Sequence, residues 1–293
     1  MRAPAGYPLP VHVTFYGTRG SCPCSGAGYR KYGGNTPCVA LEADATPLLI
    51  MDLGTGLRAL GEVLDRQLHR QGKPLEATAL LTHLHFDHIM GLPFFRPLQD
   101  PGAIIDVYGP SQENMTLQEV MKSVVQPPFF PIEMSEFRGE LRFLDTADDD
   151  LVVGNAKIRS RTVPHRGHTL GFRIEADSKT VVYLPDHQAP LDRQEVSDAV
   201  LELCEGADVL IHDAQYTDEE FTEKHDWGHS TVPYAIRVAA DAGVRRLVLF
   251  HHDPAHSDRD IDRMVSTARK LPDARRLADI TAAYEGMTIE LGS

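Results

Sequence analysis

Short apolar runs recur along the whole chain, separated by polar stretches and by segments with helical spacing. Most runs are rich in β-branched residues and are bounded by Gly, Pro or Asp, which is typical of β-strands. They predict strands at Val11–Tyr16, Val39–Glu42, Leu48–Met51, Thr78–Leu81, Ile104–Tyr108, Leu141–Leu144, Lys157–Val163, Gly171–Glu175, Val181–Leu184, Val209–Ile211 and Arg246–Phe250.

Several longer segments between these runs carry apolar residues at the spacing of a helix face. They predict helices at Leu57–His69, Leu117–Val124, Arg193–Cys204, Thr231–Ala242 and Asp260–Lys270. Ser230 directly precedes the fourth of them and is expected to cap it. The proline-rich segment Gln126–Phe137 fits neither a regular helix nor a central strand. We predict a loop there, with a lid or a dimer contact as the alternative.

Strands interrupted by helices fill both halves of the chain, with no internal repeat and no low-complexity linker. Many of the strands follow one another directly, which favours two mixed sheets covered by outer helices. We therefore predict an α/β fold in one domain that spans residues 1–293.

The composition is that of a globular enzyme, with 42% hydrophobic and 24% charged residues. The net charge of −13 disfavours a large nucleic acid as partner, because Lys and Arg supply most of the affinity for phosphate backbones. No apolar run approaches the roughly 20 residues that span a bilayer, and Met1–Pro10 lacks a signal-peptide layout. We predict a cytoplasmic protein with no membrane partner.

The four cysteines do not form a recognisable zinc clip. A single residue separates Cys22 from Cys24, whereas common clips have two, and Cys38 and Cys204 form no second pair. We interpret all four as reduced thiols of a cytosolic protein.

Three histidines and one aspartate are packed between positions 83 and 88, just after a predicted strand. Open α/β sheets place their chemistry at such strand ends. His83 and His85 can point to one side of the loop, while Asp87 and His88, after a turn, can reach a second locus ~3–4 Å away, the usual separation of two metals. Imidazole and carboxylate ligands suit Zn²⁺, Mn²⁺ or Fe. The loop therefore predicts two divalent metal ions, with zinc favoured.

Two metal ions need more ligands than one loop provides. His165, Asp186 and the pair His251–His252 each follow a short predicted strand, as the first cluster does. This common placement predicts that they converge on the same site. Within the last pair, the residues alone leave the choice of ligand open.

The sequence His83-Leu84-His85-Phe86-Asp87-His88 resembles the HxHxDH signature of the metallo-β-lactamase superfamily. Asp52-Leu53-Gly54-Thr55-Gly56 resembles its upstream aspartate–glycine motif, and the resemblance extends roughly from Tyr16 to Pro254. It implies an αββα sandwich with a dinuclear site along the sheet edges. By the family pattern, one metal is held by His83, His85 and His165, the other by Asp87, His88 and His251, and Asp186 bridges them. Asp52 is expected to orient the metal loop by hydrogen bonds.

Two of these ligands have competitors. In the ribonuclease Z-like branch, the ligand stands six residues before the glycine of a Gly-aromatic-Arg motif, which favours His165 over His168. His168 is then expected to face the substrate or to make a hydrogen bond behind the ligands. The ligand that directly follows the strand is favoured at the second position, which is His251 rather than His252.

Further motifs resemble the ribonuclease Z branch, which also contains cyclic-nucleotide phosphodiesterases. Ile211–Gln215 resembles its His-Glu-Ala-Thr motif with Asp213 in place of the glutamate, and Gly228–Thr231 resembles its His-Ser-Thr motif. The resemblance implies that His229, held by Asp213, gives a proton to the leaving alkoxide while a metal-bridging hydroxide attacks phosphorus. The alternative is that His229 only packs beside the following helix. Asp87 is expected to have a catalytic role as well as binding metal. Arg19 lies in a glycine-bracketed turn and is expected to bind phosphate, with a plain surface arginine as the alternative.

The choice of substrate rests on the absence of a basic arm. Ribonuclease Z holds tRNA with a basic, glycine-rich extension, whereas residues 112–139 here contain two basic side chains, Lys122 and Arg138, against four glutamates. We therefore predict a small phosphodiester substrate such as a cyclic nucleotide. The alternatives are a tRNA 3′-processing endonuclease, a lactonase or iron-dependent dioxygenase on the same fold, and a non-enzymatic metal-bound sensor. A homodimer with loops over the cleft is compatible with the branch.

Overall fold

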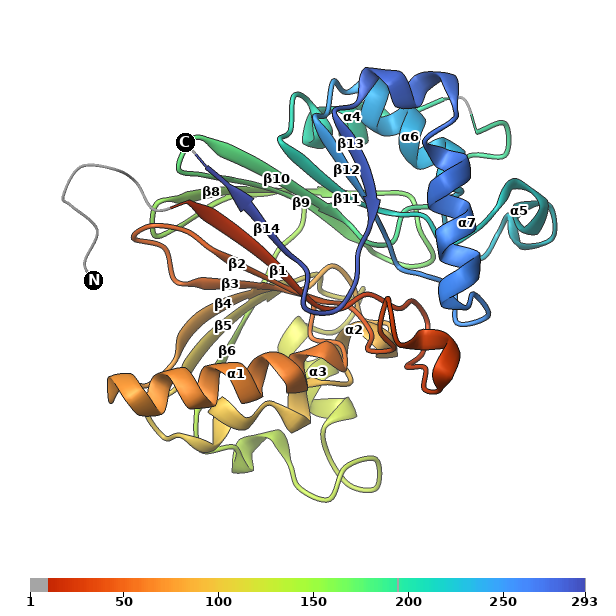
Figure 1. Cartoon of the computed structure of the whole chain (residues 1–293). Helices are drawn as coiled ribbons and strands as arrows, with labels where there is room; N and C mark the ends of the chain where they lie inside the picture. Colours follow the sequence, from red (N-terminus) through yellow and green to blue (C-terminus); the bar gives the residue numbers. More distant parts are fainter. Residues whose placement is uncertain (1–9, 194, 293) are drawn as a thin grey trace.

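The computed structural model describes residues 10–193 and 195–292. They form two seven-stranded sheets that pack face to face, with helices on both outer faces (Figure 1). The predicted αββα architecture is therefore confirmed. No helix among these residues is long and apolar enough to cross a bilayer.

The first sheet has the strand order β14-β1-β2-β3-β4-β5-β6. Its strands are antiparallel from β14 to β3 and parallel from β3 to β6. Their bounds are β1 Val11–Gly17, β2 Cys38–Glu42, β3 Leu48–Met51, β4 Glu76–Leu80, β5 Ile104–Gly109, β6 Glu140–Asp145 and β14 Thr288–Leu291.

The second sheet has the order β13-β12-β11-β10-β9-β8-β7 and the same division into an antiparallel and a parallel part. Its antiparallel part runs from β7 to β10, and its parallel part runs from β10 to β13. The bounds are β7 Asp150–Val153, β8 Ala156–Thr162, β9 Leu170–Ala176, β10 Lys179–Leu184, β11 Val209–Asp213, β12 Arg246–Phe250 and β13 Asp279–Ala282.

Most of the helices lie on the two outer faces of the sandwich (Figure 1). Those that follow first-sheet strands are α1 Gly56–Gln71, α2 Phe86–Ile89 and α3 Leu117–Val124. Those that follow second-sheet strands are α4 Asp198–Cys204, α5 Asp218–Lys224, α6 Val232–Asp241 and α7 Asp258–Ala268. Short 3₁₀ turns occur at Ala27–Tyr29, Leu92–Phe94, Arg96–Gln99, Met134–Glu136 and Pro272–Arg276.

Apolar side chains form three buried layers. The middle layer lies between the sheets and includes Phe15, Phe172 and Phe250, none of which has measurable exposure. The outer layers lie under α1 and α3 on one side and under α4, α6 and α7 on the other. Because side chains alternate along each strand, the central strands feed both a middle and an outer layer. The strand ends are therefore held rigidly, and these ends carry the candidate site.

Several predicted elements differ from the observed ones. The helix predicted from Arg193 begins at Asp198, because Arg193 has a positive φ of 53° and Ser197 is extended at the N-cap. Thr231, not Ser230, caps α6. The Thr231 hydroxyl accepts from the backbone N–H of Tyr234, whereas the Ser230 hydroxyl donates to the carbonyl of His187. The edge strands β7, β13 and β14 were not predicted, because they are short and gain their pairing from a neighbouring strand.

The segment 126–137 is largely irregular, as predicted, with one 3₁₀ turn at Met134–Glu136. Met134 and Phe137 are buried against the first sheet's outer layer. The segment therefore packs on the body of the protein.

Candidate metal centre

The site lies where loops from both sheets meet. The cluster at positions 83–88 follows β4 of the first sheet, and α2 begins inside it at Phe86. From the second sheet, His165 follows β8, Asp186 follows β10 and His251 follows β12. The structure therefore brings together residues that are far apart in the sequence, as their common position after strands predicted.

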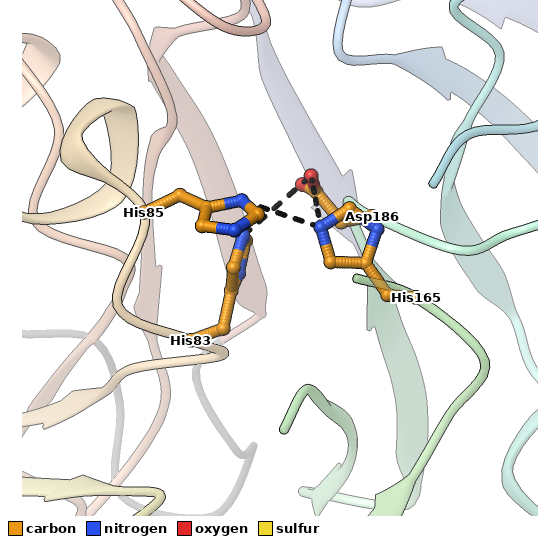
Figure 2. A group of neighbouring side chains, drawn as sticks. All are labelled: His83, His85, His165 and Asp186. Atoms are coloured by element: carbon orange, nitrogen blue, oxygen red, sulfur yellow. Dashed lines mark hydrogen bonds and ion pairs between the residues drawn. The ribbon is translucent and has the colours of Figure 1, made fainter. Parts of the chain in front are cut away.

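A first group of four side chains surrounds one locus: His83, His85, His165 and Asp186 (Figure 2). One potential ligand atom from each lies within 4.8 Å of the others. The Asp186 Oδ2 atom is 3.7 Å from His83 Nε2 and 3.5 Å from His165 Nε2. His165 Nε2 is also 3.4 Å from His85 Nδ1.

A second group lies on the other side of the same aspartate. The Asp186 Oδ1 atom is 3.1 Å from His88 Nε2 and 3.2 Å from His251 Nε2. Asp87 Oδ2 is 3.3 Å from His88 Nε2 and 3.2 Å from His251 Nε2. Each oxygen of Asp186 therefore faces one of the two groups, which is the position of a bridging ligand.

The unpaired polar atoms of the cluster fit a bound cation. His83 Nε2, His88 Nε2 and Asp186 Oδ1 are buried, and none of them makes a hydrogen bond of proper geometry, although His88 Nε2 and Asp186 Oδ1 lie 3.1 Å apart. Leaving buried polar atoms unpaired is costly, and native proteins rarely do it without a functional reason. Divalent cations with mixed nitrogen and oxygen ligands would satisfy all three atoms at once.

The electrostatics of the cluster also suit metal binding. Burial, reinforced by the neighbouring imidazole of His88, holds the pKa of His83 well below its usual range, so the ring is neutral as a ligand must be. Burial opposes ionisation of Asp87, but the His88 and His251 rings outweigh it and lower the pKa of this carboxyl. Burial likewise opposes charge on His88, yet the carboxylates around it, Asp87 first, raise its pKa. These carboxylates thus favour a positive charge at the centre of the cluster.

The outer nitrogen of several rings is fixed by a hydrogen bond. His88 Nδ1 donates to Asp52 Oδ2 at 2.8 Å, His251 Nδ1 donates to Gln215 Oε1 at 2.7 Å, and His165 Nδ1 donates to the carbonyl of Gly228 at 2.6 Å. A donating Nδ1–H leaves the Nε2 lone pair facing the cluster. The structure thus places Asp52 where an orienting residue is expected.

The sequence did not predict two residues that support the cluster by hydrogen bonds, Tyr183 and Gln215. The Tyr183 hydroxyl donates to Asp52 Oδ2 at 2.9 Å, and Gln215 holds His251. Tyr183 sits in a β-strand with apolar neighbours, so nothing in the pattern separates it from the core. Gln215 stands two residues after Asp213, and only that proximity signals its role.

The structure places one member of each competing pair, His165 and His251, in the cluster. His252 is buried with Nε2 donating to the carbonyl of Ala283 at 2.9 Å, whereas His251 lies in the cluster with a positive φ of 59°. His168 lies outside the cluster, with Nδ1 3.3 Å from the carbonyl of Ser111. The strained backbone of His251 is characteristic of functional sites, where the surrounding structure sustains the cost.

The expectation that Arg19 binds phosphate is wrong. Its side chain is fully buried, and its guanidinium donates to the carbonyls of Gly33, Asp253 and His256 at 2.9, 3.1 and 2.8 Å. A buried guanidinium that donates to three backbone carbonyls does not reach a substrate. Arg19 instead ties the N-terminal loop to the segment after β12.

That N-terminal loop supports the site directly. The backbone N–H of Ser21 donates to Asp87 Oδ2 at 2.8 Å. Residue 20 must be a glycine for a steric reason, because a Cβ there would lie 2.4 Å from His251 Nδ1. The sequence offered a glycine-bracketed turn here but no sign of this contact.

Asp213 and His229 form a buried pair beside the cluster. His229 Nδ1 donates to Asp213 Oδ2 at 2.9 Å and lies 3.8 Å from Asp186 Oδ2. The His229 ring stacks on His251 with centroids 4.9 Å apart. Burial disfavours the charged imidazole, but the Asp213 carboxylate outweighs it and raises the pKa of His229. Asp213 itself is held by the backbone N–H groups of His187 and Gln215.

Two layered sheets with a His/Asp cluster between their strand ends define a metal-dependent hydrolase of the metallo-β-lactamase type. A model of the beta-lactamase superfamily domain matches residues 49–252, and the chain belongs to that superfamily. The match includes every residue of the two ligand groups.

Named relatives and solved structures agree with this family. A ribonuclease Z of Myxococcus xanthus is 26% identical over 329 aligned positions, which cover 96% of this chain and 98% of the relative. The metallo-beta-lactamase fold protein YhfI from Bacillus subtilis has a TM-score of 0.71 at 20% identity, over 96% of this chain and 99% of YhfI. A diphosphatase of the PhnP family has a TM-score of 0.62 at 21% identity, over 96% and 97%.

Proposed function

We propose that this hydrolase is a dinuclear metal-dependent phosphodiesterase that acts on small phosphodiesters such as cyclic nucleotides. The observation that carries the proposal is the Asp213–His229 pair, which is hydrogen-bonded at 2.9 Å, with His229 Nδ1 3.8 Å from Asp186 Oδ2. A phosphodiester needs both charge neutralisation at its oxygens and a proton for its leaving alkoxide. The cluster and the pair would supply these two requirements.

Two divalent cations would be held by the two groups of ligands. His83, His85 and His165 would hold one and Asp87, His88 and His251 the other, with Asp186 shared between them. When bound, such cations supply an activated hydroxide and positive charge for the phosphate oxygens. We favour zinc, with manganese or iron as alternatives, because histidine-rich sites with carboxylates accept all three.

The protein residues would orient the reaction around these ions. Asp213 fixes Nδ1 of His229, so Nε2 is the atom left to give a proton to the leaving oxygen. Asp87, held by Ser21, would keep its ligand position through turnover. His168 remains our proposal for a contact with the substrate, because it lies partly exposed on the loop that carries His165.

The region between β5 and β6 supports the proposal of a small substrate. In this region Leu117, Met121 and Val125 are buried against the first sheet, so α3 and the following loop fold back on the body. The alignment with the ribonuclease Z relative is longer than this chain, so the relative has residues with no counterpart here. Both observations agree with a protein that lacks a tRNA-holding extension.

A tRNA 3′-processing endonuclease is the second candidate, because the ribonuclease Z relative is matched over nearly its full length. Both candidates cleave a phosphodiester and would use the same site. The cytoplasmic location also remains a proposal, supported by the free thiols of Cys22 and Cys24. A homodimer stays a prediction from the sequence.

A substrate screen on metal-analysed protein separates the candidates. We expect chelator-sensitive turnover of bis(p-nitrophenyl) phosphate and of 2′,3′- or 3′,5′-cyclic nucleotides. Efficient cleavage of precursor tRNA with no turnover of cyclic nucleotides would favour the endonuclease. Hydrolysis of an acyl-homoserine lactone alone would replace the phosphodiesterase by a lactonase.

A further inference from the structure

Two large aromatic side chains are exposed on segments that adjoin the candidate metal centre, one from each half of the sandwich. Phe86 is 67% exposed and Trp227 is 60% exposed, although both are sizeable apolar groups. Burying such side chains is normally favourable by roughly 2 kcal/mol or more each. Exposed aromatics on ordered backbone near a catalytic site are typical of ligand-binding surfaces.

Phe86 is placed by the metal loop itself. It is the first residue of α2 and lies between His85 and Asp87, one from each ligand group. Its carbonyl accepts from the backbone N–H of Met90, so its backbone is fixed while its ring faces solvent. Because His85 is the exposed member of the first group, this side of the cluster is open.

Trp227 is placed by the loop that carries the proton-donor candidate. The next residue, Gly228, accepts from His165 Nδ1 through its carbonyl and donates through its N–H to Gln188 Oε1. The backbone N–H of Trp227 donates to the carbonyl of Lys224 at 3.0 Å. The Lys224 ammonium group also lies 5.6 Å from the centroid of the indole ring. Trp227 therefore lies on a hydrogen-bonded turn, two residues before His229 and on the second-sheet side.

We propose that Trp227 and Phe86 form an aromatic rim that stacks the nucleobase of the phosphodiester substrate. This inference rests on the proposed phosphodiesterase function and names its substrate class, a diester that carries a purine or pyrimidine. Bases stack on indole and phenyl faces with little sequence preference, because every base has a π-face. Two Cα–Cα steps of about 3.8 Å separate Trp227 from His229, so a base on the rim leaves its phosphate within reach of the cluster.

The same base chemistry occurs in a free cyclic nucleotide and at an RNA 3′ end. The rim would stack the base of either substrate, so the size of the substrate that is cleaved distinguishes a cyclic nucleotide from an RNA end. A 2′,3′-cyclic nucleotide and a short oligoribonucleotide are therefore separate arms of the test. A higher kcat/KM for the cyclic nucleotide assigns the rim to the small diester, whereas a higher value for internal cleavage of the oligoribonucleotide assigns it to RNA.

The first measurement uses the fluorescence of Trp227, which is the only tryptophan of the chain. In the metal-loaded protein we expect AMP to quench this fluorescence saturably, while ribose 5-phosphate, which has the phosphate but no base, leaves it unchanged. Equal quenching by both compounds, or none by AMP at millimolar concentration, would overturn the stacking assignment. This readout does not depend on turnover.

The second measurement compares variants on substrates with and without a base. For Trp227→Leu and Phe86→Leu we expect KM for 2′,3′-cyclic AMP to rise about 5- to 100-fold, the range that base–aromatic stacking supplies. KM for glycerol 1,2-cyclic phosphate is expected to stay unchanged, and Trp227→Phe is expected to restore most of the affinity. Tyr284→Leu, at an exposed aromatic on the β13–β14 connection, is the matched control.

The outcomes separate the two proposals. Turnover of both diesters with equal effects of the variants on each overturns the rim and leaves the phosphodiesterase standing. Base-dependent quenching without turnover of any diester overturns the phosphodiesterase and leaves a nucleotide-binding rim.

Discussion

The proton-donor role of His229 is tested by removing its imidazole and varying the leaving group. His229 is almost fully buried and is held by Asp213 at 2.9 Å, so His229→Ala removes one oriented group and leaves the ligand residues in place. Loss of a general acid costs on the order of 10²–10⁴ in rate. Each factor of ten corresponds to about 1.4 kcal/mol, so the barrier would rise by about 3–5 kcal/mol.

This loss should depend on the leaving group. The ribose alkoxide of a cyclic nucleotide is strongly basic and needs a proton as the bond to phosphorus breaks. The p-nitrophenolate of bis(p-nitrophenyl) phosphate is a stable anion and does not. We therefore expect the full loss of kcat for 2′,3′-cyclic AMP and little loss for bis(p-nitrophenyl) phosphate, measured side by side on protein with known metal content.

Asp213→Asn should reproduce the effect and also weaken the fold. Asp213 Oδ2 accepts from His229 and from the backbone N–H of His187, and Oδ1 accepts from that of Gln215. In either orientation the amide NH₂ of asparagine would face an N–H donor. We expect a loss of about 1–3 kcal/mol in the free energy of unfolding, because a buried donor is left unpaired.

His225→Ala is the matched control, since it removes an exposed imidazole four residues from His229. Its rate should equal that of the unaltered protein with both substrates. If His229→Ala retained its metal and lost the same factor with both leaving groups, His229 would not be the proton donor, and the packing interpretation would stand.

Further predictions concern the metal, the buried arginine and the thiols. Elemental analysis is expected to find about two divalent metal ions per chain, and chelation should lower Tm, because ions that bind the folded state stabilise it; a metal-free active protein would contradict the site. Arg19→Met should lower the free energy of unfolding in urea by about 2–5 kcal/mol, since three carbonyls lose their donor; a change below ~0.5 kcal/mol would show that these bonds are not needed. Cys22 is exposed and should react with a thiol reagent in the native protein, whereas Cys38 and Cys204 should react only on unfolding, because burial raises the pKa of both thiols. Rapid modification of all four cysteines without unfolding would contradict that packing.

Sequence patterns carry more information about central elements of the fold than about its edges. Central strands and long helices are encoded by many apolar positions, so their number and place could be read directly. The helix start at Asp198 and the cap at Thr231 depend on local backbone geometry, which few residues encode. The edge strands β7, β13 and β14 depend on a partner strand, and pairing partners are invisible in a linear pattern.

The site shows the same division. The sequence by itself indicated a metal centre, because a dense cluster of His and Asp after a strand is typical of metal binding. It also indicated the candidate pair of Asp213 and His229. The tertiary structure decided which of these side chains lie together in each group, because that depends on how loops from two sheets meet around Asp186. It also decided against Arg19 as a phosphate ligand. A charged residue between glycines looks the same in sequence whether its guanidinium faces a substrate or three buried carbonyls, and only the packing of distant segments distinguishes the two.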